Sequence, residues 1–306
     1  MRNLFLKVMN TQSMNSSPLI EVQENCIGCS KCVEVCPRYL FTIENKKAVI
    51  TNFDPCHDCG HCLAICPVDA IIHHRIIKNS LEEDFPPVGK TLSYDEILET
   101  IRQRRSIRRF TDKKVSDEDI AKLIQLGRYA PSGHNHCRVS YTIINDRKEI
   151  EWILENMIQL FKKMKKQLNS KIISFLAILA GKGKFFAQAR RNLYRLESHI
   201  YHWEKGIDKV LHYSSTVILI HVDKTGSPIE DCNIAAQNIM LGAPTLGLGA
   251  TYIGYLLKSW ENSEKIREII NLPEGHTLYA CLAIGYPKNK FKRLVPRPEP
   301  RITIRE

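Results

Sequence analysis

The sequence lacks any long apolar run, although 43% of its 306 residues are hydrophobic. The longest candidate, residues 172–180, is interrupted by Ser174, whereas a membrane-spanning helix needs about 20 apolar residues. The N-terminal LFLKV is too short for the apolar region of a secretory signal, and we interpret the residues before Pro18 as a frayed leader. We therefore expect a protein without a membrane span.

Acidic residues are missing from 156–196, where ten Lys or Arg occur, and the whole chain carries a formal charge of +11. Such a surplus fits solvated basic side chains, and it also fits attraction of an anionic partner or a cofactor phosphate. Nothing in the sequence matches a nucleic-acid-binding motif, so we predict no nucleic-acid partner. For 156–196, a solvated helical face and a lid or docking surface both stay open.

Cysteine, in contrast, is abundant and regularly spaced. Eight of the eleven cysteines form two runs, CIGCSKCVEVCP at 26–37 and CHDCGHCLAICP at 56–67. The spacing C-x2-C-x2-C-x3-C-P is that of bacterial two-cluster ferredoxins, in which the fourth cysteine of each run ligates the other cluster. It predicts two [4Fe–4S] clusters. The first would be held by Cys26, Cys29, Cys32 and Cys66. The second would be held by Cys56, Cys59, Cys62 and Cys36.

Zinc sites and disulfides are the alternatives for these cysteines, but paired zinc ligands do not have this doubled triplet followed by Cys-Pro. Pro37 and Pro67 should end a short helix after each fourth cysteine. Gly28 and Gly60 should leave room for backbone amides near the sulfur atoms. We interpret the neighbouring histidines, His57, His61, His73 and His74, as surface or packing residues. Because thiolate clusters persist in reducing compartments, we expect a cytoplasmic protein.

Helical and strand patterns alternate after the cysteine runs. Ser93 and Ser116 occupy N-cap positions of two expected helices, and residues 216–222 and 278–284 have the composition of buried strands. This order predicts an α+β fold. We divide the chain into a small ferredoxin-like domain at 18–78, a linker at 79–94 and a larger domain at 95–306 that contains a helical insertion at 150–212.

A second informative stretch is RQRRSIRRF at 102–110, which places five arginines within eight residues. Guanidinium groups and a hydroxyl suit a phosphate and a flavin pyrimidine edge. APSGHN at 130–135, LGLGATYIGY at 246–255 and GYPKNKFKRLVPRP at 285–298 follow it. In this order the motifs resemble the nitroreductase family of FMN-dependent oxidoreductases over roughly residues 95–306. The chain as a whole resembles a ferredoxin–nitroreductase fusion.

The resemblance implies an FMN site and a homodimer with FMN at the subunit interface. Contacts to the phosphate, the ribityl chain and the pyrimidine edge are implied for Arg104, Arg105, Ser106 and Arg108. The P-S-x-x-N segment, which usually comes from the partner subunit in this family, implicates Pro131, Ser132 and Asn135. Backbone amides facing the reactive edge of the flavin are implied for Ile253 and Gly254. A late arginine that closes on the phosphate would be Arg293 or Arg297.

One departure from the family pattern follows Asn135. Many relatives continue as N-x-Q-P, whereas this chain has Cys137 and Arg138 at the Gln and Pro positions. We interpret Cys137, like Cys232 and Cys281, as a small buried residue. Protons for a reaction at the flavin would come from solvent or from a group such as His134 or Tyr255.

These observations predict an FMN-dependent oxidoreductase that passes electrons between its own two clusters and FMN and reduces a small conjugated acceptor, either nitroaromatic or quinone-like. Without a G-x-G-x-x-G after a strand there is no Rossmann site, and the donor could be NAD(P)H or an external protein such as reduced ferredoxin. The alternative is an electron-transfer adapter between protein partners, with 156–196 as its docking face. A flavin-fragmenting or dehalogenating relative is a third possibility.

Overall fold

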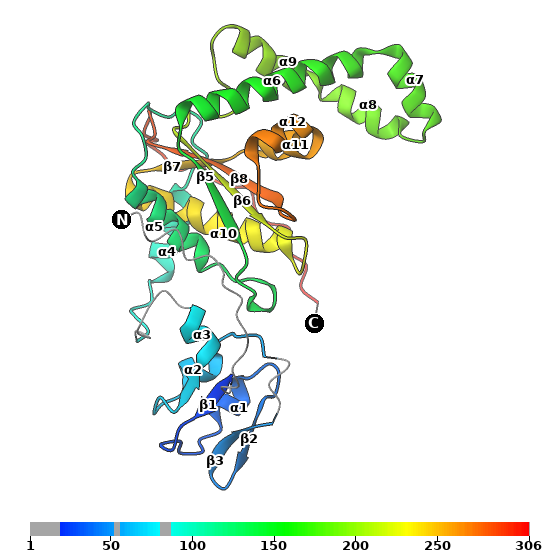
Figure 1. Ribbon diagram of the computed structural model, residues 1–306. Coiled ribbons are helices and arrows are strands. Elements are labelled where there is room, and N and C mark those ends of the chain that lie inside the picture. The colour runs from blue at the N-terminus through cyan, green and yellow to red at the C-terminus, as the bar shows by residue number, and fades with distance from the viewer. Residues whose placement is uncertain (1–18, 52–55, 80–86, 306) are drawn as a thin grey trace. The chain divides into compact units, whose positions relative to one another are not determined.

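The computed structural model describes residues 19–51, 56–79 and 87–305. The chain divides into two compact units, residues 1–90 with 134–136 and residues 91–133 with 137–306. Figure 1 shows their helices and strands. The expected leader before Pro18 and part of the expected linker lie outside the described residues. No helix within the described ranges is both long and apolar enough to cross a bilayer.

The first unit contains two small antiparallel ladders, β1 with β4 and β2 with β3. Its elements are β1 (Ile20–Val22), α1 (Lys31–Val35), β2 (Phe41–Glu44), β3 (Lys47–Ile50), α2 (His61–Ile65), β4 (Ile71–His73) and α3 (His74–Asn79). Ile20, Leu40, Phe41 and Ile71 form its buried core together with sulfur atoms of the cysteine runs. A core this small gives limited stability by itself.

Each cysteine run ends its short helix in the same way. The fourth cysteine, Cys36 or Cys66, caps α1 or α2 in an extended conformation. A proline follows each of them, and a residue before proline is excluded from the helical region by the proline ring. The prediction that Pro37 and Pro67 end these helices is therefore confirmed.

The second unit is built around a four-stranded antiparallel sheet with strand order β5-β6-β8-β7. Its strands are β5 (Ser140–Ile144), β6 (Thr216–Val222), β7 (Gly249–Tyr252) and β8 (Thr277–Gly285). Its longer helices are α4 (Tyr94–Gln103), α5 (Asp117–Arg128), α6 (Arg147–Asn169), α7 (Lys171–Leu179), α8 (Gly183–Arg191), α9 (Leu193–Glu204), α10 (Pro228–Gly242), α11 (Gly254–Asn262) and α12 (Glu264–Ile270). The 3-10 turns are η1 (Gly133–Asn135) and η2 (Ala243–Leu246).

Helices cover both faces of this sheet, which makes three layers (Figure 1). Val217 and Leu219 of β6 pack into a core with α6, α11 and α12. Ile218 and Ile220 point the other way, into a core with α5 and α10. Alternate residues of a strand point to opposite faces. Because β6 is buried on both faces, its residues are apolar except for Thr216 and His221, which are buried as well. The predicted α+β fold is confirmed.

Residues 150–212 form most of α6 and all of α7, α8 and α9. Helices α6 and α9 contribute buried residues to the core, whereas α7 and α8 have none. Ion pairs join α6 to α9 through Lys162 with Glu204 and Lys165 with Glu197. Figure 1 shows α7 and α8 at the far end of α6, away from the sheet.

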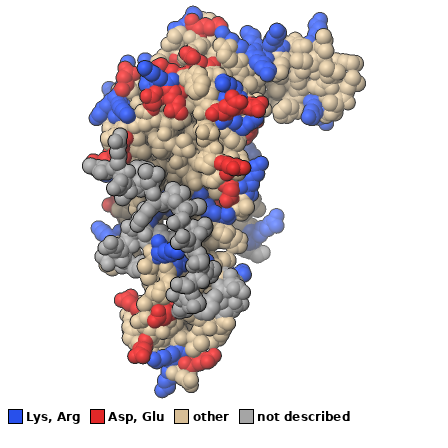
Figure 2. All heavy atoms as spheres, in the orientation of Figure 1, with Lys and Arg blue, Asp and Glu red and all other residues tan. Residues whose placement is uncertain are grey.

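The α7–α8 segment exposes apolar and basic side chains together. Phe175 of α7 is 61% exposed and Phe185 of α8 is 77% exposed. Lys182 and Lys184 lie between them in the chain, and in Figure 2 this end of the molecule shows tan and blue atoms.

Candidate functional site

Two pockets of the first unit collect all eight regularly spaced cysteines. Cys26, Cys29, Cys32 and Cys66 line one pocket, and the other four cysteines line the second. The empty volumes are about 340 and 330 Å³, open solvent at the mouth included, so the two sites are of equal size. Each pocket takes three cysteines from one run and the fourth from the other. This is the arrangement that the spacing predicts for two four-iron clusters.

The loops that carry the cysteines adopt the same backbone conformation in both runs. Left-handed residues occupy the third position of each run, Gly28 and Asp58, and the fifth position, Ser30 and Gly60. These turns aim successive cysteines at one point. Gly28 has a second reason to be glycine, because a Cβ there would lie 2.3 Å from the carbonyl oxygen of Lys46. Gly28 and Gly60 thus occupy different positions in their runs, and the sequence alone did not separate their roles.

Backbone N–H groups point at the sulfur atoms. Leu40 N–H donates to Cys36 Sγ at 3.4 Å, and Ala70 N–H donates to Cys66 Sγ at 3.2 Å. The two bonds are equivalent, since each comes from the residue four positions after the cysteine. Donors of this kind stabilise negatively charged sulfur.

The buried, closely spaced thiols of each pocket would lose their protons only beside a positively charged group such as a metal ion. Burial, with a smaller contribution from the neighbouring Cys59, Cys56 and Cys36, raises the pKa of the Cys62 thiol to about 12. Burial also raises the pKa of Cys32. A bound metal deprotonates such thiols outright. The donor set, with four sulfur atoms at each site, fits iron–sulfur clusters.

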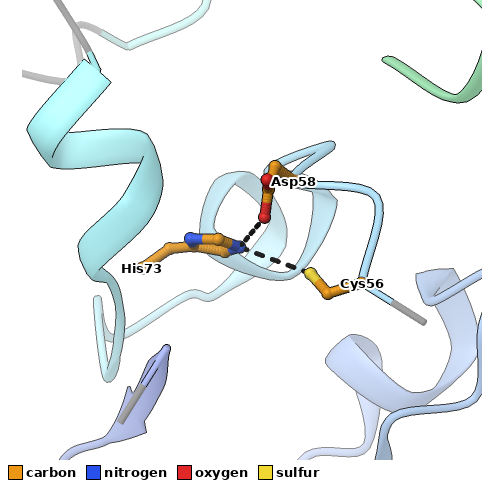
Figure 3. Close-up of side chains that lie close together, drawn as sticks. All are labelled: Cys56, Asp58 and His73. Carbon is orange, nitrogen blue, oxygen red and sulfur yellow. Dashed lines mark hydrogen bonds and ion pairs between the residues drawn. The ribbon is translucent and has the colours of Figure 1, made fainter. Parts of the chain in front are cut away.

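A histidine that we had read only as a surface or packing residue lies next to one of these cysteines. His73 Nε2 is 3.5 Å from Cys56 Sγ and 3.5 Å from Asp58 Oδ1 (Figure 3). Asp58 is held in turn by Arg75, whose Nη1 is 2.7 Å from Asp58 Oδ2. Burial lowers the pKa of His73. His74, by contrast, is half-exposed and pairs with Glu21 at 3.4 Å.

In the second unit, the arginine-rich segment runs along the edge of the sheet. Ser106 forms a parallel bridge with Ala250 of β7, and Ile107 N–H donates to the Ala250 carbonyl oxygen at 3.0 Å. Thr111 N–H donates to the Tyr286 carbonyl oxygen at 2.9 Å, just after β8. The backbone of the segment is therefore fixed, and its arginine side chains extend from a rigid base.

Arg105 carries the clearest sign of a missing partner in this segment. Its Nη2 is buried and has no hydrogen-bond partner among the described residues. A buried guanidinium nitrogen without an acceptor is costly, so the position is suited to an acceptor-rich group such as a phosphate. Arg104 and Ser106 are partly buried beside it, and Arg108 is exposed.

The loop at 208–215 is a part of this region that the sequence analysis missed. The buried Asp208 carboxylate accepts the backbone N–H groups of Val210 and Leu211 at 2.8 Å each and of Tyr213 at 2.7 Å. This holds His212 in a left-handed conformation, where its carbonyl oxygen accepts Phe110 N–H. Burial lowers the pKa of His212 to about 4. The only sequence signal was the polar run HYSS between two apolar segments.

The P-S-x-x-N segment forms a tight turn. Ser132 Oγ accepts Cys137 N–H at 2.9 Å, and Gly133 N–H donates to Asp231 Oδ1 at 2.9 Å. Pro131 and Asn135 are exposed. Cys137 is exposed too, so our interpretation of it as a buried residue was wrong, because it lies in a surface turn, where its φ is 50°. Cys232 and Cys281 are fully buried, as expected.

Ile253 and Gly254 join β7 to α11. Ile253 N–H donates to the Cys281 carbonyl oxygen at 2.8 Å, so it is already used within the protein. Gly254 is the first residue of α11, where N–H groups have no acceptor within the helix. Of the two amides assigned to the flavin edge, Gly254 is therefore the one positioned to donate outward.

The remaining predicted residues lie further along the chain. Tyr255 follows Gly254 in α11, and its ring is 4.6 Å from that of His199. His134 is exposed within η1. Arg293 and Arg297 are exposed in the segment after β8.

Comparison with known proteins gives two family matches. The nitroreductase family model matches residues 101–286, and a 4Fe-4S dicluster domain model matches residues 12–71. Over 202 residues, the chain is 25% identical to a protein of Archaeoglobus fulgidus named as a putative NADH dehydrogenase/NAD(P)H nitroreductase, covering 64% of this chain and 88% of that protein.

The N-terminal part has its own relatives. It is 40% identical over 50 residues to a ferredoxin of Methanothermococcus thermolithotrophicus, covering 16% of this chain and 83% of that protein. Among solved structures, a nitroreductase of Bacteroides fragilis with bound FMN superposes with a TM-score of 0.51 at 22% identity, covering 69% of this chain and 99% of that one. The latter likeness concerns the fold.

Proposed function

From its membership of the nitroreductase family of FMN-dependent oxidoreductases and its ferredoxin domain, we propose an electron-transfer function for this chain. It moves electrons between two [4Fe–4S] clusters of its own and FMN, and it reduces a small conjugated acceptor. The observation that carries the proposal is the pair of four-cysteine pockets in the same chain as the flavin-type fold. When bound, the clusters supply single electrons, and the flavin can exchange either one or two.

The cysteines would hold the clusters in the sets that line the two pockets. Backbone N–H groups from Leu40 and Ala70 would stabilise the charged sulfurs. Because both sites belong to one small unit, the clusters would be tethered to the flavin domain, which raises their effective concentration near it. Electrons could then pass between the clusters and the flavin within one chain, without a separate carrier protein for that step.

The flavin would be bound by the predicted residues of the second unit. Arg105 supports this best, because its buried Nη2 lacks an acceptor that a phosphate would provide. Arg104, Ser106 and Arg108 would complete the contacts from the same anchored segment, and Gly254 N–H would donate to the ring edge. One of Arg293 and Arg297 would close on the phosphate.

We also propose a homodimer, in which Pro131, Ser132 and Asn135 reach the flavin of the second subunit. The exposed apolar side chains of α7, such as Phe175, are consistent with association. Sedimentation of the anaerobic protein should give a native mass of twice the 35.2 kDa chain. A mass of one chain would contradict the dimer but not the cofactor assignments. The acceptor would be nitroaromatic or quinone-like, and the donor NAD(P)H or a reduced electron-transfer protein.

The deciding experiment is to purify the full chain without oxygen and to measure iron, sulfide and FMN. We expect about eight irons per chain and one FMN per chain. Full iron without flavin would refute the flavin assignment, and flavin without iron would refute the electron relay. With both present, stopped-flow mixing with an acceptor should oxidise clusters and flavin together.

The alternative function, an electron-transfer adapter, is favoured by one observation, the exposed basic α7–α8 segment. Lys162 and Lys165 are poor positions to test it, because each pairs with a glutamate of α9. Lys182→Glu with Lys184→Glu reverses exposed charge, and neither lysine has an ion pair within the part of the chain that the structure describes. The adapter predicts slower electron exchange with an acidic ferredoxin and unchanged reduction of small acceptors. Equal rates with the protein partner would exclude it.

A further inference from the structure

His73 occupies a defined place beside one of the two cysteine pockets. Its side chain is 1% exposed, and its Nε2 lies 3.5 Å from Cys56 Sγ (Figure 3). Figure 3 shows the ring approaching the sulfur from β4, while Cys56 comes from the loop before α2. A buried ring of this kind is held in one orientation by its packing.

The second ring nitrogen determines where the proton lies. The backbone N–H of Ile76 donates to His73 Nδ1 at 3.4 Å, so Nδ1 is the acceptor. In a neutral imidazole the other nitrogen then carries the proton. Nε2–H therefore donates to Cys56 Sγ. Asp58 Oδ1 lies at the same distance of 3.5 Å from Nε2 as an ion-pair contact (Figure 3). It accepts no hydrogen bond within the described residues, and Asp58 Oδ2 is held by Arg75.

The sister pocket is built differently at the same position. The runs lie 30 residues apart, so Cys56 corresponds to Cys26 and His73 corresponds to Ile43. Ile43 lies in β2 as His73 lies in β4, but its side chain has no atom that can donate a hydrogen bond. Cys26 Sγ accepts a backbone N–H instead, from Ala48 at 3.4 Å. A sequence repeat has thus diverged at a position that contacts sulfur.

We propose that His73 donates its Nε2–H to Cys56 Sγ and thereby raises the reduction potential of the cluster at the second pocket, through a side-chain donor that the sister pocket lacks at the corresponding position. The inference rests on the proposed function, since it requires clusters in both pockets. Hydrogen bonds to sulfur favour the more negative, reduced form, because the bond strengthens as charge accumulates. His73 then acts as a positioning residue that raises the potential of this cluster through its bond to Cys56 Sγ.

The test is an EPR-monitored redox titration of the full-length holoprotein. His73→Phe keeps the bulk of a ring and removes both nitrogens. We expect one cluster to become about tenfold harder to reduce, which is about 59 mV for a one-electron couple, while the other cluster is unchanged. His73→Gln keeps a side-chain N–H and should restore part of the potential. Ile43→Phe, the matched substitution in the sister pocket, should leave that cluster's potential where it was.

Two unchanged potentials in a fully loaded His73→Phe protein would overturn the inference and leave the proposed function intact. Absence of clusters from the wild-type protein would instead overturn the proposed function, and the inference with it. If His73→Phe does not assemble its clusters, pulsed EPR on ¹⁵N-histidine-labelled protein decides. In a His57→Ala/His61→Ala background, which removes the other two histidines lining that pocket, a histidine nitrogen should still couple to one cluster, and a missing coupling refutes the bond.

Discussion

The backbone N–H of Ile107 donates to the carbonyl oxygen of Ala250 at 3.0 Å, and this bond fixes the arginine-rich segment to the edge strand β7. The approach is close because residue 249 is glycine, where a Cβ would lie 2.4 Å from Ile107 Cγ1. The motif LGLGATY therefore has a steric role 140 residues after the arginines that it positions.

Replacing Gly249 should loosen this contact. Gly249→Ala forces Ile107 and the strand apart, and overpacking of this kind costs about 1–3 kcal/mol. We expect a lower free energy of unfolding in urea and weaker FMN binding, because the arginines would move with the backbone. Gly89→Ala is the matched control, since a Cβ there meets nothing within 4 Å. An unchanged FMN affinity in Gly249→Ala would show that the segment does not position the flavin.

Removal of the Arg105 side chain tests the phosphate contact directly. A charge-assisted hydrogen bond contributes about 1.5–3 kcal/mol, so Arg105→Ala should weaken FMN binding by about 10- to 100-fold. The measurement is quenching of flavin fluorescence on titration of the apoprotein. Arg102→Ala, at an exposed position that pairs with Glu99, should bind FMN like the wild type. Equal FMN affinities for Arg105→Ala and Arg102→Ala would show that the FMN phosphate does not bind at Arg105.

Several parts of this structure could be predicted from the sequence because their cause is local. The capping box of Ser93 and Glu96 and the cap of Ser116 on Asp119 are both present. The apolar run of β6 is buried on both faces because helices cover the sheet on each side. The cysteine spacing groups the same residues that line each of the two pockets, and their role as cluster ligands stays a prediction.

Features that depend on distant residues could not be read in the same way. Ile97 and Ile101 share one face of α4, yet they are 44% and 48% exposed, since periodicity shows which side is apolar and not what covers it. His73 reaches Cys56 across 17 residues, and the burial of Arg105 depends on the sheet edge. The composition around Cys137 did not show whether this residue is buried, and the structure places it in an exposed turn.

The exchange of the fourth cysteine between the two runs has a consequence for iron content. Cys29→Ser and Cys66→Ser should disturb the same cluster, although the two residues belong to different runs. We expect each variant to lose up to about four of about eight irons and to weaken the same EPR signal. Cys36→Ser should affect the other signal. If Cys66→Ser and Cys59→Ser weaken the same EPR signal instead, each run would hold one cluster with its own four cysteines. Cys137→Ser should retain all the iron.

Buried histidines should make stability depend on pH. Burial, together with the nearby His276, lowers the pKa of His221 to about 4, and the Nδ1 atoms of the two rings are 2.8 Å apart. The unfolded chain, with a histidine pKa near 6.5, then binds a proton that the folded chain does not. The free energy of unfolding should therefore fall as the pH drops from about 6.5 towards about 4. His212 contributes in the same direction and in the same window.

His221→Gln should reduce this pH dependence, because glutamine does not titrate and its amide can still bond Thr142, whose Oγ1 lies 2.9 Å from His221 Nε2. Urea denaturation of the wild type and the variant at a series of pH values between 4 and 7 measures the difference. His202→Gln, at a partly exposed position on α9, is the control and should retain the wild-type slope. Parallel curves for His221→Gln and the wild type would mean that the pKa of His221 is the same in the folded and the unfolded chain, and this result would refute the effect of burial on the ring.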